Sequence, residues 1–340
     1  MTALSNLNRR TLLATLATTA LPSTLWAQTP AKKRAKLVLA GPPASVSNAL
    51  TRIVDSGALA AWADQVQFTP WTTPDQLRAL TLDGAADFIA TPSNVAANLY
   101  NRGVPLTLLN IGTWGNLWMV SRSPDKKTLA DFKGEEIAMP FRSDMPDILF
   151  QLLAEKQGLS PQRDFRLRYV ATPLEAMQQL VMRQVDHALL AEPAVSMALR
   201  KTQSFPGNLV APTLHRSVDL QKEWGRVLQR PPLIPQAGIA ALGEARNDPA
   251  LLAAFQTAYA DAQQWCASQP EACGQSMAKH SGGLLLPEAV ADGIRAAPKH
   301  LASARQARAE LEFFYGLLLQ RQPALVGGKL PDAAFYGGAA

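Results

Sequence analysis

The strongest constraint on the fold is a repeated alternation of short apolar runs, typical of buried strands, with amphipathic runs typical of helices. Near the N-terminal end, strand-like runs at 36–40, 66–71, 87–90 and 104–111 alternate with helical patterns that begin at polar or proline-containing turns. A second series of the same kind starts at Glu136. Strands that alternate with helices indicate mostly parallel sheets covered by helices. We therefore expect an α/β fold.

The pattern also predicts two lobes joined by hinge crossovers. At 340 residues the chain is longer than one hydrophobic core usually allows. The alternation restarts after residue 115, and an apolar strand at 238–242 is placed to return the chain to the first sheet. We assign lobe 1 to residues 35–115 and 234–340, and lobe 2 to residues 116–233. Each lobe should hold a mostly parallel sheet flanked by helices.

Three further elements are expected late in the chain. A short strand is predicted at 209–212, a helix at 219–228, and a helical pattern from Asp248 to Leu319. The segment from Gly327 to Asp332 is predicted to be a loop.

The first 27 residues have the pattern of an export signal. Arg9 and Arg10 precede an uncharged, moderately apolar run that ends at Leu21, and the small residue Ala27 marks a cleavage site. The paired arginines are typical of twin-arginine export, and ordinary secretory export is the alternative. An N-terminal amphipathic helix of a cytosolic protein is the competing interpretation. We expect removal of residues 1–27 and localisation in the periplasm.

Charge and composition argue against several classes of protein. The formal charge of +6 falls to +4 without Arg9 and Arg10, and the Lys and Arg residues are scattered along the chain. We therefore expect no nucleic-acid partner. No run of about 18 apolar residues suggests a membrane-spanning helix.

The two cysteines are predicted to form a disulfide. Cys266 and Cys273 are seven positions apart, so on one continuous helix their Cα atoms would lie about 10 Å apart, beyond disulfide reach. Pro270 changes this, because a helix that ends near Ser268 and restarts at Pro270 folds the segment back. An oxidising compartment then favours the bridge. Two buried thiols are the alternative.

No residue pattern points to a metal, a cofactor or a familiar catalytic centre. The four histidines, at 187, 215, 280 and 300, show no metal-ligand spacing with each other or with the cysteines. The nucleophile elbow, the phosphate loop, the zinc-protease motif and the dinucleotide fingerprint are all missing. We expect no metal, no cofactor and no enzymatic activity.

Polar turns at the ends of predicted strands form the candidate binding site. They lie at 41–47, 91–94, 141–144 and 192–193, each directly before a predicted helix. The first N–H groups of a helix have no partner within it and attract anions. Because open α/β sheets gather ligands at the carboxyl ends of their strands, two facing lobes would line one cleft with these turns.

The candidate ligand-binding residues are those in and beside these turns. They are Pro42, Ser45, Trp71, Thr91, Ser93, Asn94, Thr113, Trp114, Arg142, Ser143 and Glu192.

Most of these candidates also have a structural interpretation. Arg142 can clamp an anion in a bidentate manner, or it can pair with Asp144 or Asp147 in solvent. The tryptophans, Trp71 and Trp114, can wall a ligand or simply pack.

Ser93 and Asn94 can act as helix caps without losing the ability to contact a ligand. Glu192 can accept hydrogen bonds from an amine or ring nitrogen, or it can cap the helix after Pro193.

These residues resemble the periplasmic binding proteins that serve nitrate, sulfonate, taurine and thiamine-precursor import. The resemblance runs over nearly all of the chain after the export signal. Its strongest pieces are the segments 87–90, 128–134 and 186–193 and the closing Gly-Gly-Lys-Leu-Pro-Asp at 327–332. It implies a type II periplasmic-binding-protein fold with the ligand between two lobes. It also implies contacts from Pro42–Ser45, Thr91–Asn94, Thr113–Trp114, Arg142–Ser143 and Glu192.

The chain departs from that family in two turns. It has Met-Pro-Phe-Arg at 139–142 where members often have small residues, and it has Pro42-Pro43 in the first turn. These departures indicate a pocket that differs from a standard sulfonate site.

The resemblance implies the substrate-binding component of an ABC importer, which captures a small polar solute, anionic or heterocyclic, and delivers it to a membrane permease. We expect a monomer. Relatives of this fold include thiamine-pyrimidine-synthase-like enzymes, but the cysteine-rich motif of those enzymes is missing here. A periplasmic partner of a membrane receptor that senses the ligand is the other alternative.

Overall fold

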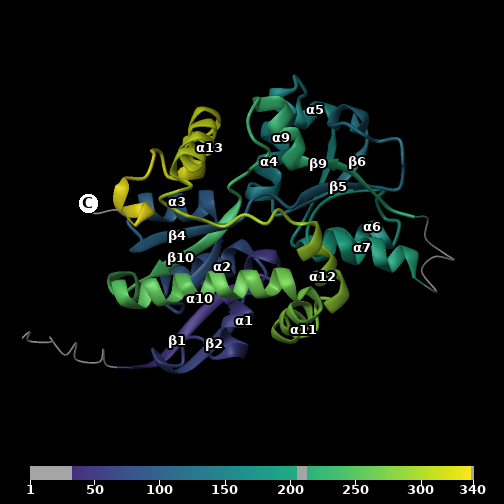
Figure 1. Cartoon of the computed structure of the whole chain (residues 1–340). Coiled ribbons are helices and arrows are strands. Elements are labelled where there is room, and N and C mark those ends of the chain that lie inside the picture. The colour runs from purple at the N-terminus through teal and green to yellow at the C-terminus, as the bar shows by residue number, and fades with distance from the viewer. Residues whose placement is uncertain (1–32, 205–212, 338–340) are drawn as a thin grey trace, which may run out of the picture. The chain divides into compact units, whose positions relative to one another are not determined.

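The computed structural model describes residues 33–204 and 213–337, which form two β-sheets covered by helices (Figure 1). The predicted export signal and the predicted strand at 209–212 lie outside the described residues. We call the first sheet with its covering helices lobe 1 and the second sheet with its covering helices lobe 2.

The sheet of lobe 1 has six strands in the order β11-β4-β10-β3-β1-β2. The strands are β1 (Arg34–Gly41), β2 (Ala63–Pro70), β3 (Phe88–Pro92), β4 (Leu106–Thr113), β10 (Ala237–Leu242) and β11 (Ala302–Ser303). The sheet of lobe 2 has five strands in the order β7-β6-β8-β5-β9. They are β5 (Leu117–Ser121), β6 (Glu136–Pro140), β7 (Arg166–Val170), β8 (His187–Ala191) and β9 (His215–Asp219).

The expectation of mostly parallel sheets is confirmed, because four strands of each sheet run in one direction: β1, β2, β3 and β4 in lobe 1, and β6, β7, β8 and β9 in lobe 2. β1 pairs in parallel with β2 and β3, and β6 pairs in parallel with β7 and β8. β10 runs antiparallel to β3 and β4, and β5 runs antiparallel to β8 and β9. The reason is topological: β5 and β10 are the strands by which the chain enters each sheet from the other lobe, so each one runs against its neighbours.

The insertion of β10 depends on one glycine. A Cβ atom at Gly238 would lie 1.8 Å from the backbone oxygen of Asn110 in β4. Because two atoms cannot approach that closely, the return of the chain to the first sheet requires a residue without a side chain at this position.

The helices occupy the positions that the alternating pattern predicts between the strands. Those between the strands of lobe 1 are α1 (Asn48–Ser56), α2 (Pro74–Leu82) and α3 (Ser93–Asn101). Those between the strands of lobe 2 are α4 (Met145–Lys156), α5 (Pro161–Asp164), α6 (Pro173–Val181) and α7 (Ala194–Gln203), with α9 (Leu220–Leu228) after β9. The C-terminal region adds α10 (Pro249–Ser268), α11 (Pro270–His280), α12 (Pro287–Ala296) and α13 (Arg308–Arg321). In residues 33–204 and 213–337, no helix is long and apolar enough to cross a membrane.

The C-terminal region is less continuously helical than the sequence predicts. β11 and its flanking residues interrupt the helical pattern expected between Asp248 and Leu319. β9 was not predicted, because its residues, His215 to Asp219, include a single apolar side chain, Val218, and lack the apolar run of a buried strand.

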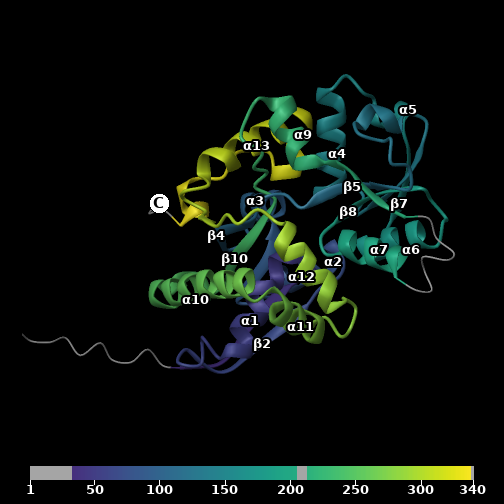
Figure 2. The same cartoon turned by 45° about the vertical axis from the view of Figure 1, so that its right-hand side comes forward.

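The C-terminal helices contact both lobes, although the sequence assigned residues 234–340 to lobe 1. Both views place α12 beside α7, and Arg200 of α7 pairs with Asp292 of α12 (Figures 1 and 2). On α13, Arg321 pairs with Glu155 of α4, and Phe314 packs against Trp224 of α9. The last helices therefore join the two lobes at places away from the strand crossovers.

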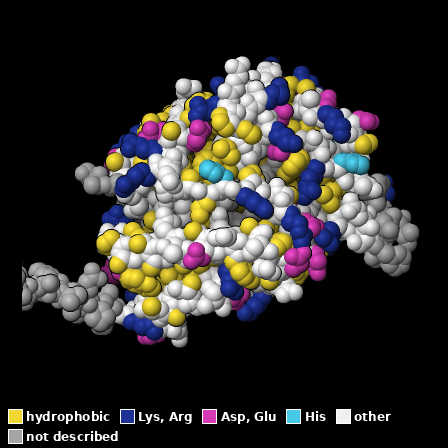
Figure 3. All heavy atoms as spheres, in the orientation of Figure 1, with side chains coloured by type: hydrophobic (Ala, Val, Ile, Leu, Met, Phe, Trp, Pro, Cys, Tyr) yellow, Lys and Arg dark blue, Asp and Glu magenta, His cyan; other side chains and the backbone are white. Residues whose placement is uncertain are grey.

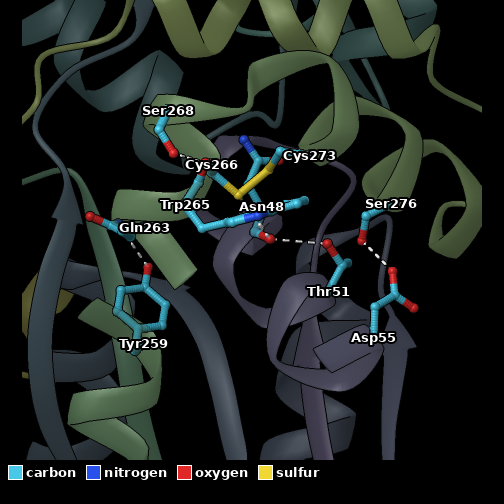
Figure 4. The surroundings of a disulfide bond; sticks show 10 residues. All are labelled: Asn48, Thr51, Asp55, Tyr259, Gln263, Trp265, Cys266, Ser268, Cys273 and Ser276. Atoms are coloured by element: carbon cyan, nitrogen blue, oxygen red, sulfur yellow. Dashed lines mark hydrogen bonds between the residues drawn. A yellow bond between two sulfur atoms is a disulfide. The ribbon is translucent and has the colours of Figure 1, made fainter. Parts of the chain in front are cut away.

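The cysteines form a disulfide at the corner between two helices. α10 ends at Ser268 and α11 begins at Pro270, so the Cα atoms of Cys266 and Cys273 lie 5.1 Å apart (Figure 4). This is the chain reversal that Pro270 predicts. The disulfide lies over α1, where the backbone oxygen of Asn48 is 3.8 Å from Cys266 Sγ.

A charged cluster fastens α11 to α1 close to this disulfide. Asp55 of α1 accepts hydrogen bonds from Ser276 at 2.6 Å and from Lys279 at 3.1 Å, and it lies 2.9 Å from the His280 ring nitrogen (Figure 4 shows Asp55 and Ser276). Burial alone would raise the pKa of the Asp55 carboxyl, but these partners hold that pKa below its ordinary value of 3.8.

This cluster predicts a specific pH dependence of stability. Between its lowered folded pKa and 3.8, the Asp55 carboxyl is protonated in the unfolded chain and ionised in the folded one. Its contribution is therefore present above pH 3.8 and is lost as the pH falls through the folded pKa. We expect the Asp55→Asn variant to be less stable than the wild type at pH 7 and the difference to shrink below about pH 4. Urea unfolding at several pH values measures this.

Asp83, which is exposed, provides the control for this series. The Asp83→Asn variant should follow the wild type at every pH. A difference between the Asp55→Asn variant and the wild type that stays constant down to pH 2 would contradict the assignment.

Charges of both signs are interspersed on the face shown in Figure 3. Neither the basic nor the acidic side chains gather there into one large patch. This face therefore offers no basic stripe of the kind that binds nucleic acid.

Candidate ligand-binding cleft

A cavity of about 410 Å³ lies between the strand ends of the two sheets. Its walls are the turns that follow β1, β2 and β3 in lobe 1 and β6, β7 and β8 in lobe 2. The carboxyl ends of the strands of both lobes therefore face the same space, which is the arrangement that open α/β sheets use for ligands. The volume is within the range of small-molecule pockets.

The wall from lobe 1 is mainly apolar. Pro42, Pro43 and Ala44 come from the turn after β1, and Trp71 follows β2. Trp71 is buried, and its indole nitrogen has no hydrogen-bond partner among the described residues. Because the nitrogen itself is buried, Trp71 presents only apolar ring atoms to the cavity.

The wall from lobe 2 consists of three helix starts. Phe141 and the start of α4 follow β6, the start of α6 follows β7, and the start of α7 follows β8. Thr172 caps α6 by accepting a hydrogen bond from the Glu175 N–H, and Glu192 accepts one from the Ser196 N–H in α7. The predicted capping role of Glu192 is thus confirmed.

Two crossover segments close the cavity at the hinge. The side chain of Gln236 donates to Asn116 Oδ1 at 2.9 Å and accepts from the Asn116 N–H at 3.2 Å. The Gln236 N–H donates to the Thr113 carbonyl at 3.1 Å. All three residues line the cavity. These bonds tie the outgoing segment before β5 to the returning segment before β10.

Contacts across the cleft join its walls. Arg78 of α2 pairs with Asp144, the N-cap residue of α4, at 3.3 Å, and the Ser45 hydroxyl donates to the Glu192 carbonyl at 3.3 Å. Burial raises the pKa of the Asp144 carboxyl, and the charge of Arg78 opposes that rise. Arg78 therefore compensates a buried carboxyl that lies at the cavity wall.

The charged side chains that line the cavity are all acidic, and each one is already engaged. Asp144 bonds to Arg78 and to the Met145 N–H, and Glu175 accepts from the Ala171 N–H. Glu192 pairs with Arg216 and accepts from the Ser196 N–H. None of the lining residues is Lys, Arg or His in the part of the chain that the structure describes.

The structure brings five of the sequence-based candidates to this cavity and places the other six elsewhere. Pro42, Trp71, Thr91, Thr113 and Glu192 line it.

Ser45 and Trp114 line a separate cavity of about 370 Å³, where Trp114 packs against His300 with ring centroids 4.7 Å apart. The Ser93 hydroxyl donates to the Pro235 carbonyl, and Asn94 is buried behind the cavity wall in α3.

Arg142 and Ser143 are exposed and do not line the cavity. The guanidinium of Arg142 lies over the Tyr169 ring, 5.1 Å from its centroid. Both Phe141 and Ser143 have positive φ angles, so the turn is tight and directs the chain so that Phe141 and Asp144 reach the cavity. The proposed anion clamp at Arg142 has no support from this geometry.

The sequence-based search missed Asp144, Thr172, Gln178 and Gln236, which line the cavity. Thr172 and Asp144 precede helices and follow strands, so the strand-end rule alone identifies them as candidates. Gln178 and Gln236 carry no local signal, because their positions depend on how the lobes face each other.

No group of three or more His, Cys, Asp and Glu side chains within residues 33–204 and 213–337 is placed to hold a metal ion. His187 lies within the sheet of lobe 2, 2.9 Å from the Ser121 hydroxyl. Burial lowers its pKa.

Two sheets with a cavity between their strand ends define the fold of two-lobed ligand-binding proteins, and known structures share it. An ABC transporter protein from Parabacteroides distasonis is 24% identical over 88% of this chain and 98% of that one, with a TM-score of 0.70. The periplasmic aliphatic sulphonate binding protein SsuA from Escherichia coli is 18% identical over 87% and 97%, with a TM-score of 0.63. The periplasmic nitrate-binding protein NrtA from Synechocystis PCC 6803 is 14% identical over 85% and 82%, with a TM-score of 0.62. The predicted type II periplasmic-binding-protein fold is confirmed.

The chain belongs to the family described as menaquinone biosynthesis, whose model matches residues 64–314. That match spans both lobes. No curated protein sequence gives a significant match.

Proposed function

We propose that the protein is the solute-binding component of an importer, which closes two lobes around a small organic molecule. The observation that carries this proposal is the cavity whose walls come from both lobes, with contacts across it from Arg78 to Asp144 and from Ser45 to Glu192. A ligand that touches both walls stabilises the closed arrangement, because its contacts with one wall are lost when the lobes separate.

The same proposal includes export to the periplasm and delivery to a membrane permease by a monomeric protein. The twin-arginine-like pattern at Arg9 and Arg10 and the disulfide between Cys266 and Cys273 support an exported, oxidising location. The fold is shared with the ligand-binding component of an ABC-type import system from Staphylococcus aureus, at a TM-score of 0.66.

A second candidate function is a catalytic role in menaquinone biosynthesis, which the family match favours. The two functions differ in what happens to the ligand. A binding protein returns it unchanged at one molecule per chain, whereas an enzyme converts it.

The direct test is a thermal-shift screen of residues 28–340 against sulfonates, nitrate, carboxylates, pyrimidines and uncharged aromatic compounds. A ligand that binds the folded state raises the melting temperature. Small-angle scattering then measures whether the ligand draws the lobes together, and mass spectrometry measures whether it is altered. Multiple turnover of the ligand would replace the binding function with the catalytic one.

Trp71 should contribute strongly to the affinity of any solute found in this way. It is a buried aromatic side chain of the cavity wall, so the Trp71→Ala variant removes a large apolar contact. We expect its dissociation constant to rise about tenfold or more. Isothermal titration calorimetry measures this change.

The matched control for this variant is Trp265→Ala. Trp265 packs under the Arg52 guanidinium, 3.9 Å from its ring centroid, and does not line the cavity. The control should bind the solute as the wild type does. Equal affinities of the Trp71→Ala variant and the wild type would remove Trp71 from the site.

A further inference from the structure

The lining of the cavity is unusual for an anion-binding site, since it is mostly apolar and has no counter-charge. Leu77, Met145, Leu174 and Leu284 contribute to it together with Trp71 and Phe141. The lining acids are held by other groups, and Arg78 and Arg216 each pair with one of these acids. An anion placed here would lose its hydration without meeting a free cation, which is strongly unfavourable.

Prolines remove helix N–H donors that an anion would otherwise use. Five helices start at the cavity, α2, α3, α4, α6 and α7, and each one carries a proline at its N-cap or first two positions. These prolines, which all line the cavity, are Pro74, Pro92, Pro146, Pro173 and Pro193. Because proline has no N–H, each one takes a possible donor away from the helix start and adds an apolar ring.

The chain's own side chains occupy further N–H groups of the same helix starts. Thr73 accepts from Gln76 in α2, and Thr172 accepts from Glu175 in α6. Asp144 accepts from the Met145 N–H in α4, and Glu192 accepts from the Ser196 N–H in α7. In α3, the Ser93 N–H donates to the Gln236 carbonyl. The strand-end turns that the sequence predicts to be anion-receptive are therefore largely satisfied within the protein.

Trp71 offers no donor to an anion either. It is only 5% exposed, and its indole nitrogen is buried, so a molecule in the cavity meets the apolar ring and not the N–H.

We propose that the solute is an uncharged, largely apolar ring compound. This proposal rests on the solute-binding function above and narrows its ligand class. Of the two ligand classes that the resemblance implies, anionic or heterocyclic, it excludes the anionic one, because the cavity has a mostly apolar lining, no free cation among the described lining residues and helix starts that are largely satisfied within the protein.

Three probes of similar shape and different charge test this ligand class. Methyl cinnamate is uncharged and carries an acceptor, cinnamate is its anionic counterpart, and cinnamylammonium is the cationic one. We expect methyl cinnamate to bind residues 28–340 about tenfold or more tightly than either ion by calorimetry.

A charge added to the cavity should reverse the preference. Gln178 lines the cavity from α6, so Gln178→Arg places a cation beside the bound probe. We expect this variant to lower the dissociation constant of cinnamate about fivefold or more. The dissociation constant of methyl cinnamate should stay within about twofold of its wild-type value. The control is Gln203→Arg, which adds the same charge at an exposed position of α7 away from the cavity.

The outcomes separate the ligand class from the binding function. Cinnamate or cinnamylammonium binding as tightly as the ester would overturn the uncharged ligand class. If small-angle scattering then showed that the lobes close around the bound cinnamate or cinnamylammonium, the solute-binding function would still be supported. No binding of methyl cinnamate at millimolar concentration also overturns the ligand class, and the broader solute screen then decides the function. If Gln203→Arg and Gln178→Arg raised the affinity for cinnamate equally, the anion would bind outside the cavity. That result would count against the proposal.

Discussion

The Glu192→Ala variant should lose about 3 kcal/mol of its free energy of unfolding, the largest loss that we expect from a single substitution at the cleft. Glu192 is 2% exposed, and its carboxylate bonds to Arg216 and to the Ser196 N–H. Removing it leaves the Arg216 guanidinium without its carboxylate, opens a void at the start of α7 and frees a helix N–H. Urea unfolding followed by circular dichroism measures the loss.

The Glu192→Gln variant separates the charge from the space that the side chain fills. Glutamine keeps the size of the side chain and an oxygen that can accept from the Ser196 N–H, so we expect a smaller loss of about 1–2 kcal/mol. The Cβ of Glu192 would lie only 3.2 Å from a Cβ at Gly293 of α12, so the side chain also packs between the lobes. Unfolding of the alanine variant at the same urea concentration as the wild type would show that the ion pair with Arg216 is not structural.

Breaking the disulfide should cost about 2.5 kcal/mol, as expected for a bond that closes a loop of this length in the unfolded chain. The loop spans Cys266 to Cys273 and includes the reversal between α10 and α11. We expect the Cys266→Ala/Cys273→Ala double variant and the reduced wild type to unfold at similar, lowered urea concentrations. Alanine is preferred to serine because both cysteines are buried.

The state of the bond is checked independently of stability. Mass spectrometry of the oxidised protein should show the loss of two hydrogens and no free thiol, because the disulfide pairs all the cysteines of the chain. Equal unfolding midpoints for the oxidised and the reduced wild type would show that the corner is held by packing against α1 and by the contacts of Asp55 alone.

Much of the fold was predictable because it depends on local chemistry. Thr73 and Pro74 start α2, with the Thr73 hydroxyl accepting from the Gln76 N–H, and Gly57 ends α1 in the left-handed conformation. These residue types are the usual ones at such positions. Ser47 differs, because it precedes α1 but makes no side-chain cap, and its buried hydroxyl has no partner among the described residues.

The candidate site was predictable only in part. The strand-end rule identified Trp71, Thr91, Thr113 and Glu192, because the carboxyl ends of the strands follow from the order of elements along the chain. It failed for Arg142, because the direction of that side chain depends on two positive φ angles in its turn. No pattern of residue types reveals these angles when neither residue is glycine.

The sequence by itself determined most of the strands and helices, the two series of elements and the helix reversal that brings Cys266 to Cys273. Each of these follows from hydrophobic periodicity, from caps or from proline, which act over a few residues. Only the tertiary structure decided which strands run antiparallel, how α12 and α13 reach lobe 2, and what lines the cleft. These features depend on how the lobes face each other, and therefore on contacts such as Arg78 with Asp144 between residues that are distant in the chain.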